Sequence, residues 1–191
     1  MTPEEPQPTA AAEAPRSFVQ RLLGALQLQS EVYDEIAADP AATNQAVAVV
    51  TLCALAQALG GPERLPLERL PLALAWAYFS WLVPGTVVWV CATRLLGMQA
   101  DLPRVLRSVG FASAPQILWW IGLAARESVP FQLALGVLIF ALALIANVVA
   151  LRQAFAVNTL RALQAFALGF LAFAAVALVI GFLTAQLGAE L

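Results

Sequence analysis

The chain of 191 residues contains no histidine and no lysine, and it has only two cysteines, Cys53 and Cys91. Without histidine it lacks the commonest general base and the commonest metal ligand. The two cysteines fall inside apolar runs and form neither a CxxC pattern nor a zinc-ligand spacing, so we interpret them as small packing residues. The sequence therefore predicts no catalytic residue, no cofactor and no metal site, and it does not predict an enzyme.

Charge is also scarce, because only 12% of the residues are charged and the net charge is -2. This share is about half of that in an average soluble protein, and the balance gives no reason to expect a nucleic-acid partner. Hydrophobic residues make up 61% of the chain, and the mean hydropathy is +0.81. The apolar runs between the charged clusters are long enough to cross a bilayer, which takes about 20 helical residues.

These runs predict an all-α membrane protein, a bundle of five transmembrane helices preceded by an N-terminal amphipathic or interfacial helical segment. Residues 1–16 predict a disordered tail because they are rich in Pro, Ala and Glu. Residues 17–39 are expected to form cytoplasmic amphipathic helices, and residues 40–191 are expected to form the membrane domain. The five spans are expected at about residues 43–59, 71–93, 108–125, 131–151 and 160–187.

The amphipathic segment begins at Ser17, where apolar residues recur at helical spacing, at Phe18, Val19, Leu22, Leu23 and Leu26. Arg16, Gln20, Arg21, Gln27 and Gln29 are expected on the opposite side. Such a helix is too short and too polar to cross a membrane. Two interpretations stay open, a helix lying on the membrane surface and a helix packed against other cytoplasmic parts.

Arginine distribution predicts the orientation. With the N-terminus inside, seven arginines lie in cytoplasmic segments and three, Arg64, Arg69 and Arg126, lie outside. The positive-inside rule therefore favours a cytoplasmic N-terminus and, with five spans, an external C-terminus. The bias towards arginine, alanine, leucine and valine suggests a GC-rich bacterial genome, so we expect a multi-pass protein of the bacterial inner membrane.

Charged residues on the cytoplasmic side form the first group of candidate site residues. Acidic residues precede the first span, whereas arginines follow in the two cytoplasmic loops, the first of which is the charged loop that begins at Asp101. We hypothesise that the acidic segment folds over these loops as a lid; the alternative is that the arginines face anionic lipid headgroups. The candidate contacts to partners or lipid are Arg104, Arg107, Arg152, Arg161, Glu31, Asp34 and Glu35.

Two prolines within predicted spans form the second group. Pro84, followed by Gly85, and Pro115 are expected near the bilayer midplane on consecutive antiparallel helices. Each removes one backbone hydrogen bond, which gives either a simple kink or a hinge at a substrate site. The polar residues expected near them are Ser80, Ser113 and Gln116.

Three segments resemble the YIP (Ypt-interacting protein) family of integral membrane domains as it occurs in bacteria. They are FVQRLLGALQLQSEVYDEIAADPAATNQA at Phe18–Ala46, RVLRSVGFASAP at Arg104–Pro115 and LRQAFAVNTLRAL at Leu151–Leu163. The resemblance implies five spans, a cytoplasmic N-terminus and no catalytic residues. Eukaryotic relatives act in vesicle trafficking and bind Rab-type GTPases, a pathway that bacteria lack.

The sequence thus predicts an inner-membrane scaffold or adaptor of unassigned molecular function, which acts through membrane organisation or through partners at its cytoplasmic face. Its expected partners are the lipid bilayer and either a second copy of the chain or another membrane protein. The alternative is a small-solute transporter or channel subunit that uses the Pro84/Pro115 helix pair. A polar cavity at the midplane would favour the alternative, and a dry, packed bundle would favour the scaffold.

Overall fold

The computed structural model describes residues 16–62 and 65–189, and the surroundings of side chains as far as residue 179. Every regular element in these residues is helical, as predicted. Four segments are long and apolar enough to cross a membrane. They are α3 (Ala42–Gly60), η1 with α4 (Leu67–Arg69 and Leu70–Arg94), α7 (Val129–Ala154) and the part of α8 (Thr159–Ala189) that ends at Val179.

The third predicted span, residues 108–125, is not one continuous helix. The chain forms α5 (Leu102–Phe111), η2 (Ala114–Leu118), α6 (Trp119–Gly122) and η3 (Leu123–Ala125). Pro115 favours the break, since it cannot donate a hydrogen bond to Phe111 and its ring would crowd that carbonyl group. The expectation of a charged loop before this span was wrong, because Arg104 and Arg107 lie within α5.

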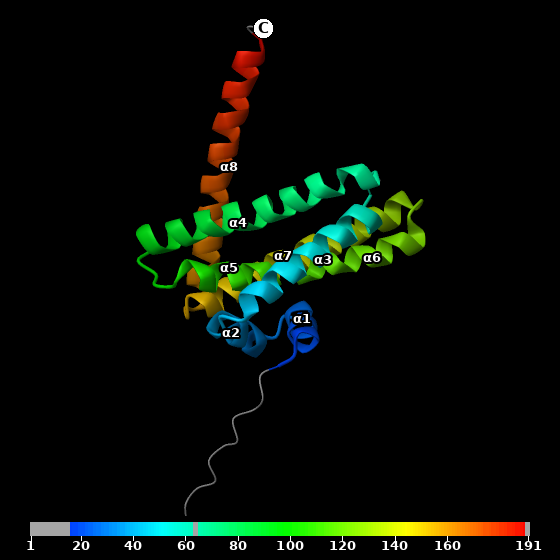
Figure 1. Ribbon diagram of the computed structural model, residues 1–191. Coiled ribbons are helices and arrows are strands. Elements are labelled where there is room, and N and C mark those ends of the chain that lie inside the picture. Colours follow the sequence, from blue (N-terminus) through cyan, green and yellow to red (C-terminus); the bar gives the residue numbers. More distant parts are fainter. Residues whose placement is uncertain (1–15, 63–64, 190–191) are drawn as a thin grey trace, which may run out of the picture.

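The elements α3, α4 and α7 lie alongside one another, and the α5–η3 segment returns along them from the C-terminal end of α4 to the start of α7 (Figure 1). In contrast, α8 crosses α4 steeply, and its C-terminal half extends away from the other helices. The crossing is close, because a Cβ atom on Gly169 would lie 2.8 Å from the Cα atom of Val88. The helix α8 is therefore attached to the bundle mainly through its N-terminal half.

A second close contact joins the C-terminal end of α3 to α6. A Cβ atom on Gly60 would overlap the carbonyl oxygen of Trp119, and a Cβ atom on Gly122 would overlap the carbonyl oxygen of Gly60. Only residues without side chains allow the two backbones to approach in this way. This contact fixes the short helices of the broken segment against α3.

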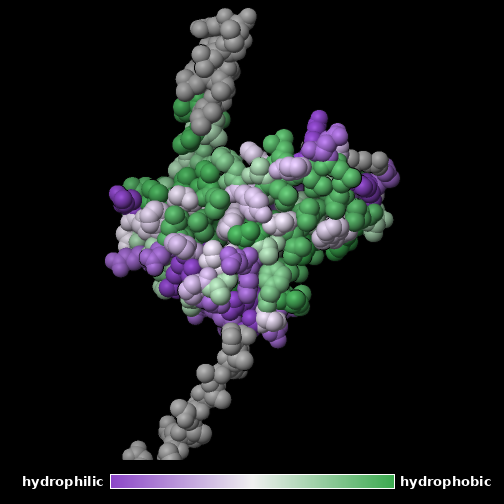
Figure 2. Space-filling view, viewed as in Figure 1, coloured by the Kyte–Doolittle hydropathy of each residue, from purple (hydrophilic) through white to green (hydrophobic). Residues whose placement is uncertain are grey.

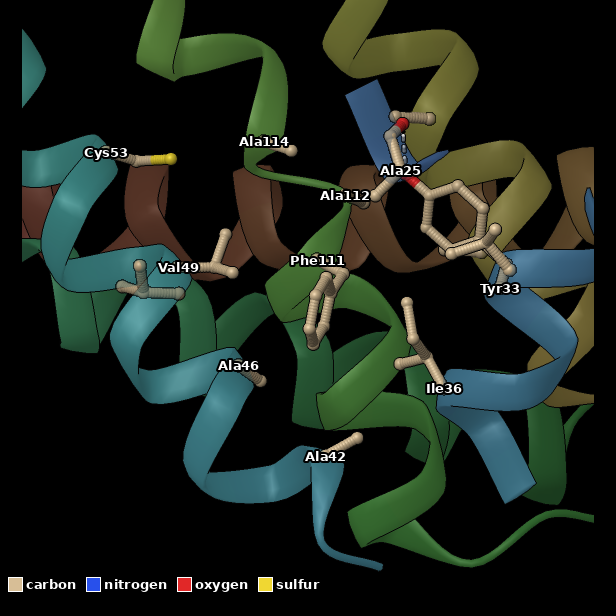
Figure 3. Packing of buried hydrophobic residues seen from close by; sticks show 14 of the residues in the cluster. Ala25, Tyr33, Ile36, Ala42, Ala46, Val49, Cys53, Phe111, Ala112 and Ala114 are labelled. Atoms are coloured by element: carbon tan, nitrogen blue, oxygen red, sulfur yellow. Dashed lines mark hydrogen bonds between the residues drawn. The ribbon is translucent and has the colours of Figure 1, made fainter. Parts of the chain in front are cut away.

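Phe111, at the end of α5, lies at the centre of the main buried cluster. It is surrounded by Ala46 and Val49 of α3 and by Ile36, which belongs to the second N-terminal helix (Figure 3). Small residues on α3 bring the helices close together, and the larger side chains fill the remaining space. The N-terminal helices consequently share a core with the apolar bundle.

Hydrophilic residues gather over the N-terminal helices and beside the connection between α3 and α4, with a largely hydrophobic surface between them (Figure 2). Many large apolar side chains of the long helices are exposed, including Trp76, Leu133, Phe140 and Phe170. An apolar belt between two polar regions is the arrangement that a bilayer requires of a multi-pass protein.

Candidate functional site

The N-terminal cap, residues 16–39, consists of two short helices, α1 (Phe18–Leu26) and α2 (Ser30–Ala38). Ser17 and Gln20 form a capping box at the start of α1. Leu28 adopts a left-handed conformation with φ 60° after α1, and the amide of Gln29 donates to the carbonyl oxygen of Gly24 at 2.9 Å. This hydrogen bond is typical of a Schellman turn, which sets the direction in which α2 begins.

Arg21 of α1 is the most buried charged residue of the cap, with 2% of its surface exposed. Its guanidinium group contacts Oε1 of Glu35 at 2.9 Å and Oδ2 of Asp39 at 2.7 Å. It also donates to the side chain of Gln45 in α3 at 3.0 Å. Arg16 forms a second ion pair with Glu35 at 2.6 Å. This network connects α1, α2 and the start of α3.

The arginines stabilise the charged forms of both acids. Burial by itself would raise the pKa of Glu35, but the hydrogen bonds from Arg16 and Arg21 outweigh it, so the pKa lies below its ordinary value. The pKa of Asp39 is lowered by the amide of Ala41 and then by Arg21. Both carboxylates are therefore ionised at neutral pH.

Arg107 of α5 attaches the cap to the bundle through hydrogen bonds to the end of α2. It is buried and donates to the carbonyl oxygens of Ile36 and Ala37 at 3.3 and 2.7 Å. These carbonyl groups lie at the C-terminal end of α2, where the helix leaves acceptors without internal partners. A cation there also interacts favourably with the helix dipole. Arg107 thus joins the cap to the start of the broken segment.

These contacts correct the lid hypothesis. The acidic segment does lie over α5, but Glu35 pairs with Arg16 and Arg21 instead of the loop arginines. Arg104 donates to the carbonyl oxygen of Gln153 at 3.2 Å and so fastens α5 to the end of α7. Among the described residues, the side chains of Arg152 and Arg161 form no hydrogen bond or ion pair, and neither does that of Asp34.

The outer face of the cap remains exposed. Of the five large apolar residues of α1, Phe18, Leu22 and Leu26 pack against the core, whereas Val19 and Leu23 are 58% and 51% exposed. Glu31 and Asp34 of α2 are also exposed. The cap therefore presents two apolar and two acidic side chains to its surroundings.

The two predicted midplane prolines lie in different environments. Pro84 is inside α4, which continues without a break, and Gly85 packs against Leu106 of α5. Pro115 is buried at the start of η2, which packs mainly against α3 and α7. The Sγ atom of Cys53 in α3 donates to the carbonyl oxygen of Ser113 at 3.1 Å. The two prolines therefore pack against different neighbours, and only Pro115 lies at a break in the helix.

A groove of about 660 Å³ lies between α3, α4 and the α5–η3 segment; we call it the α3–α4 groove. Ser80 and Gln116, both predicted site residues, line it together with Gln57 and Arg69. The amides of Gln57 and Gln116 make no side-chain hydrogen bond within the described residues. An amide that is removed from water needs a polar partner. The groove can therefore hold water or a ligand with polar groups.

Sequence reasoning missed the roles of Arg21 and Gln57. Arg21 was placed on the polar face of α1, yet its side chain is enclosed by residues 14 and 24 positions further along the chain. Such long-range pairing leaves no periodic signal in the sequence. Gln57 is a lone polar residue near the end of an apolar run, and this was the available signal for the groove.

No family model matches the chain, and no match was found among the curated proteins or the solved structures.

Proposed function

We propose that the chain is a scaffold or adaptor of the bacterial inner membrane that binds a protein partner through the N-terminal cap on the cytoplasmic side. The observation that carries this proposal is that two arginines hold the cap in place. Arg21 joins its two helices to each other, and Arg107 of α5 binds the end of α2. A surface held in this way loses little conformational entropy when it binds.

The exposed face of the cap supports the same proposal. Val19 and Leu23 lie one helical turn apart on α1 and form a small apolar ridge. Glu31 and Asp34 are the exposed acids on the adjoining α2. This combination suits a partner that offers an apolar cleft next to basic side chains.

Site-specific photo-crosslinking in native membranes tests the proposal. A photoreactive residue at Leu23 or Asp34 should give a discrete adduct, whereas the exposed loop residue Gln99 serves as the control position. Leu23→Ser and Asp34→Arg should each remove the adduct formed at the other position. Equal labelling at Gln99, or no adduct together with a monomer in mild detergent, would contradict the scaffold role.

We further propose a five-pass topology with the N-terminus in the cytoplasm and the C-terminus outside. The α5–η3 segment, residues 102–125, contains enough residues for a path of about 36 Å, which exceeds the hydrocarbon thickness of about 30 Å. It counts as a crossing although it is broken. A reporter fused after Leu191 tests the parity, because four crossings would leave it cytoplasmic and five would place it outside.

The resemblance to the YIP family remains part of this proposal. The cap, the arginines of α5 and the α7–α8 connection coincide with the three segments that carry it. It suggests an adaptor without catalysis, and an alanine scan of Leu151–Leu163 should therefore alter assembly instead of any turnover. Loss of a catalysed reaction in such a scan would contradict the adaptor role.

The alternative, a small-solute transporter or channel subunit, is supported by the α3–α4 groove and its unpaired Gln57 and Gln116. Solute flux into liposomes that contain the purified protein distinguishes the two functions. A transporter should lose flux in Gln116→Leu and keep it in Asp34→Arg. A scaffold should show no flux above that of empty liposomes.

A further inference from the structure

A second groove, of about 500 Å³, lies on the outer side of α7 near its N-terminal end; we call it the α7 groove. Its walls are largely apolar and include Trp119 and the exposed α7 residues Val129, Leu133, Val137 and Phe140. Trp119 and Pro62 line both this groove and the α3–α4 groove. None of the predicted site residues lies in it.

Two polar atoms in the wall of this groove are buried without a hydrogen-bond partner among the described residues. Gln132 is 6% exposed, and its Nε2 atom donates to the carbonyl oxygen of Gly122 at 2.8 Å. This hydrogen bond fixes the orientation of the Gln132 amide, yet the Oε1 atom of Gln132 accepts no hydrogen bond. The Nε atom of Arg126 is likewise buried and unpaired. Buried polar atoms are nearly always hydrogen-bonded, so these two atoms point to a ligand that carries polar groups.

The two atoms have complementary requirements. Arg126 needs an acceptor, and because its guanidinium group carries a positive charge, an anionic oxygen satisfies it best. Gln132 needs a donor, such as a hydroxyl group, at its Oε1 atom. One ligand headgroup that combines an anionic phosphate with a hydroxyl group meets both requirements.

The apolar wall indicates what is attached to this headgroup. Val129, Leu133, Val137 and Phe140 form one stripe along α7, at spacings of four, four and three residues. The stripe is about 16 Å long at 1.5 Å per residue, close to half of the hydrocarbon thickness of about 30 Å. Its length thus matches one leaflet, and the charged group lies at its outer end.

We propose that the α7 groove binds one glycerophospholipid whose headgroup carries an anionic phosphate and a hydroxyl group. Arg126 binds the phosphate, Gln132 Oε1 accepts a hydrogen bond from the hydroxyl group, and an acyl chain lies along the α7 stripe. The site depends on insertion of the protein in a membrane, but not on the scaffold role or on the cap.

Native mass spectrometry of the purified full chain, titrated with lipids of identical acyl chains, tests the headgroup without any mutation. Phosphatidylglycerol carries both groups, phosphatidylmethanol keeps the charge but has no headgroup hydroxyl, and phosphatidylcholine lacks the net charge. The first should bind about tenfold more tightly than phosphatidylcholine, with phosphatidylmethanol between them. Equal binding of phosphatidylglycerol and phosphatidylcholine overturns the site, and equal binding of the two anionic lipids overturns the role of Gln132.

A substitution at Arg126 locates the binding. Arg126→Gln should abolish the preference for phosphatidylglycerol, whereas Arg69→Gln, in the neighbouring groove, should keep it. The thermal midpoint of each variant in the same detergent checks that it is folded. A preference that survives in a folded Arg126→Gln protein overturns the proposal.

Discussion

Arg21 and Glu35 lie on successive short helices, and the Nε and Nη2 atoms of Arg21 both donate to Oε1 of Glu35, at 3.1 and 2.9 Å. The arginine is almost fully buried, whereas the carboxylate remains partly exposed. The carboxylate of Glu35 therefore stays partly in contact with solvent, so the pair does not bury both charges completely. This arrangement makes the cap a small folded unit with a charged centre.

Replacing Arg21 should open the cap. Arg21→Met keeps most of the side-chain volume but removes the contacts that the guanidinium group makes with Glu35, Asp39 and Gln45. We expect the free energy of local opening to fall by about 1.5–3 kcal/mol, the range for hydrogen bonds to charged groups. Hydrogen exchange of the amides between residues 18 and 38, in lipid nanodiscs, measures it. Arg94→Met, an exposed arginine at the end of α4, is the control and should leave exchange in the cap unchanged.

Acid should loosen the same unit. The folded-state pKa values of Glu35 and Asp39 are lowered, so their contribution is complete above the unfolded values of about 4.3 and 3.9 and is lost as the pH falls through the folded values. The distribution of distances between spin labels at positions 23 and 99 should therefore broaden below about pH 4. Glu35→Gln should show a weaker pH dependence, and an identical dependence in this variant would refute the assignment.

The contact between α3 and α6 should tolerate no added methyl group. Gly60→Ala places a Cβ atom against the backbone of Trp119, and overpacking of this kind costs about 1–3 kcal/mol. Unfolding in a series of mixed detergent micelles gives the change in stability. Gly136→Ala is the matched control, since its Cβ atom would meet only the ring of Trp119, at 3.3 Å. Equal losses in the two variants would show that the close approach has no importance.

Replacing Ala156 with glycine should stabilise the protein. It is exposed, has φ 51°, and follows α7 in a turn in which the amide of Val157 donates to the carbonyl oxygen of Arg152 at 3.0 Å. A left-handed conformation costs a residue with a side chain about 1–2 kcal/mol. Ala156→Gly should therefore stabilise the protein by about 1 kcal/mol in the same unfolding assay. Ala141→Gly, in the middle of α7, should have the opposite sign.

The long helices were predictable because each depends on an uninterrupted run of apolar residues. The start of α8 is also set by a local feature, because the side chain of Asn158 accepts a hydrogen bond from the amide of Arg161 at 2.9 Å. Predictions for residues 1–15 fall outside the described residues. The two interpretations of α1 could not be separated in advance, because Leu22 and Leu23 look alike in the sequence and only packing decides which one is covered.

The prolines show the limit of such reasoning. Pro84 and Pro115 both interrupt apolar runs, yet α4 continues through the first and the chain breaks into short helices at the second. Proline removes one hydrogen bond in either case, and the surrounding helices determine whether the chain continues as a helix or breaks. Similarly, the orphaned Gln132 Oε1 atom depends on where Gly122 is placed, which no local pattern encodes.

The bond from Arg107 to Ala37 has a consequence for the order in which the chain folds. Arg107 is synthesised 70 residues after Ala37, a delay of roughly 4–14 seconds at 5–20 residues per second. During this interval the carbonyl oxygens of Ile36 and Ala37 have no hydrogen bond from Arg107, and Phe111 of α5 does not yet cover Ile36. The N-terminal helices are thus made first but are fixed only after the membrane segment beyond α4 has taken its place.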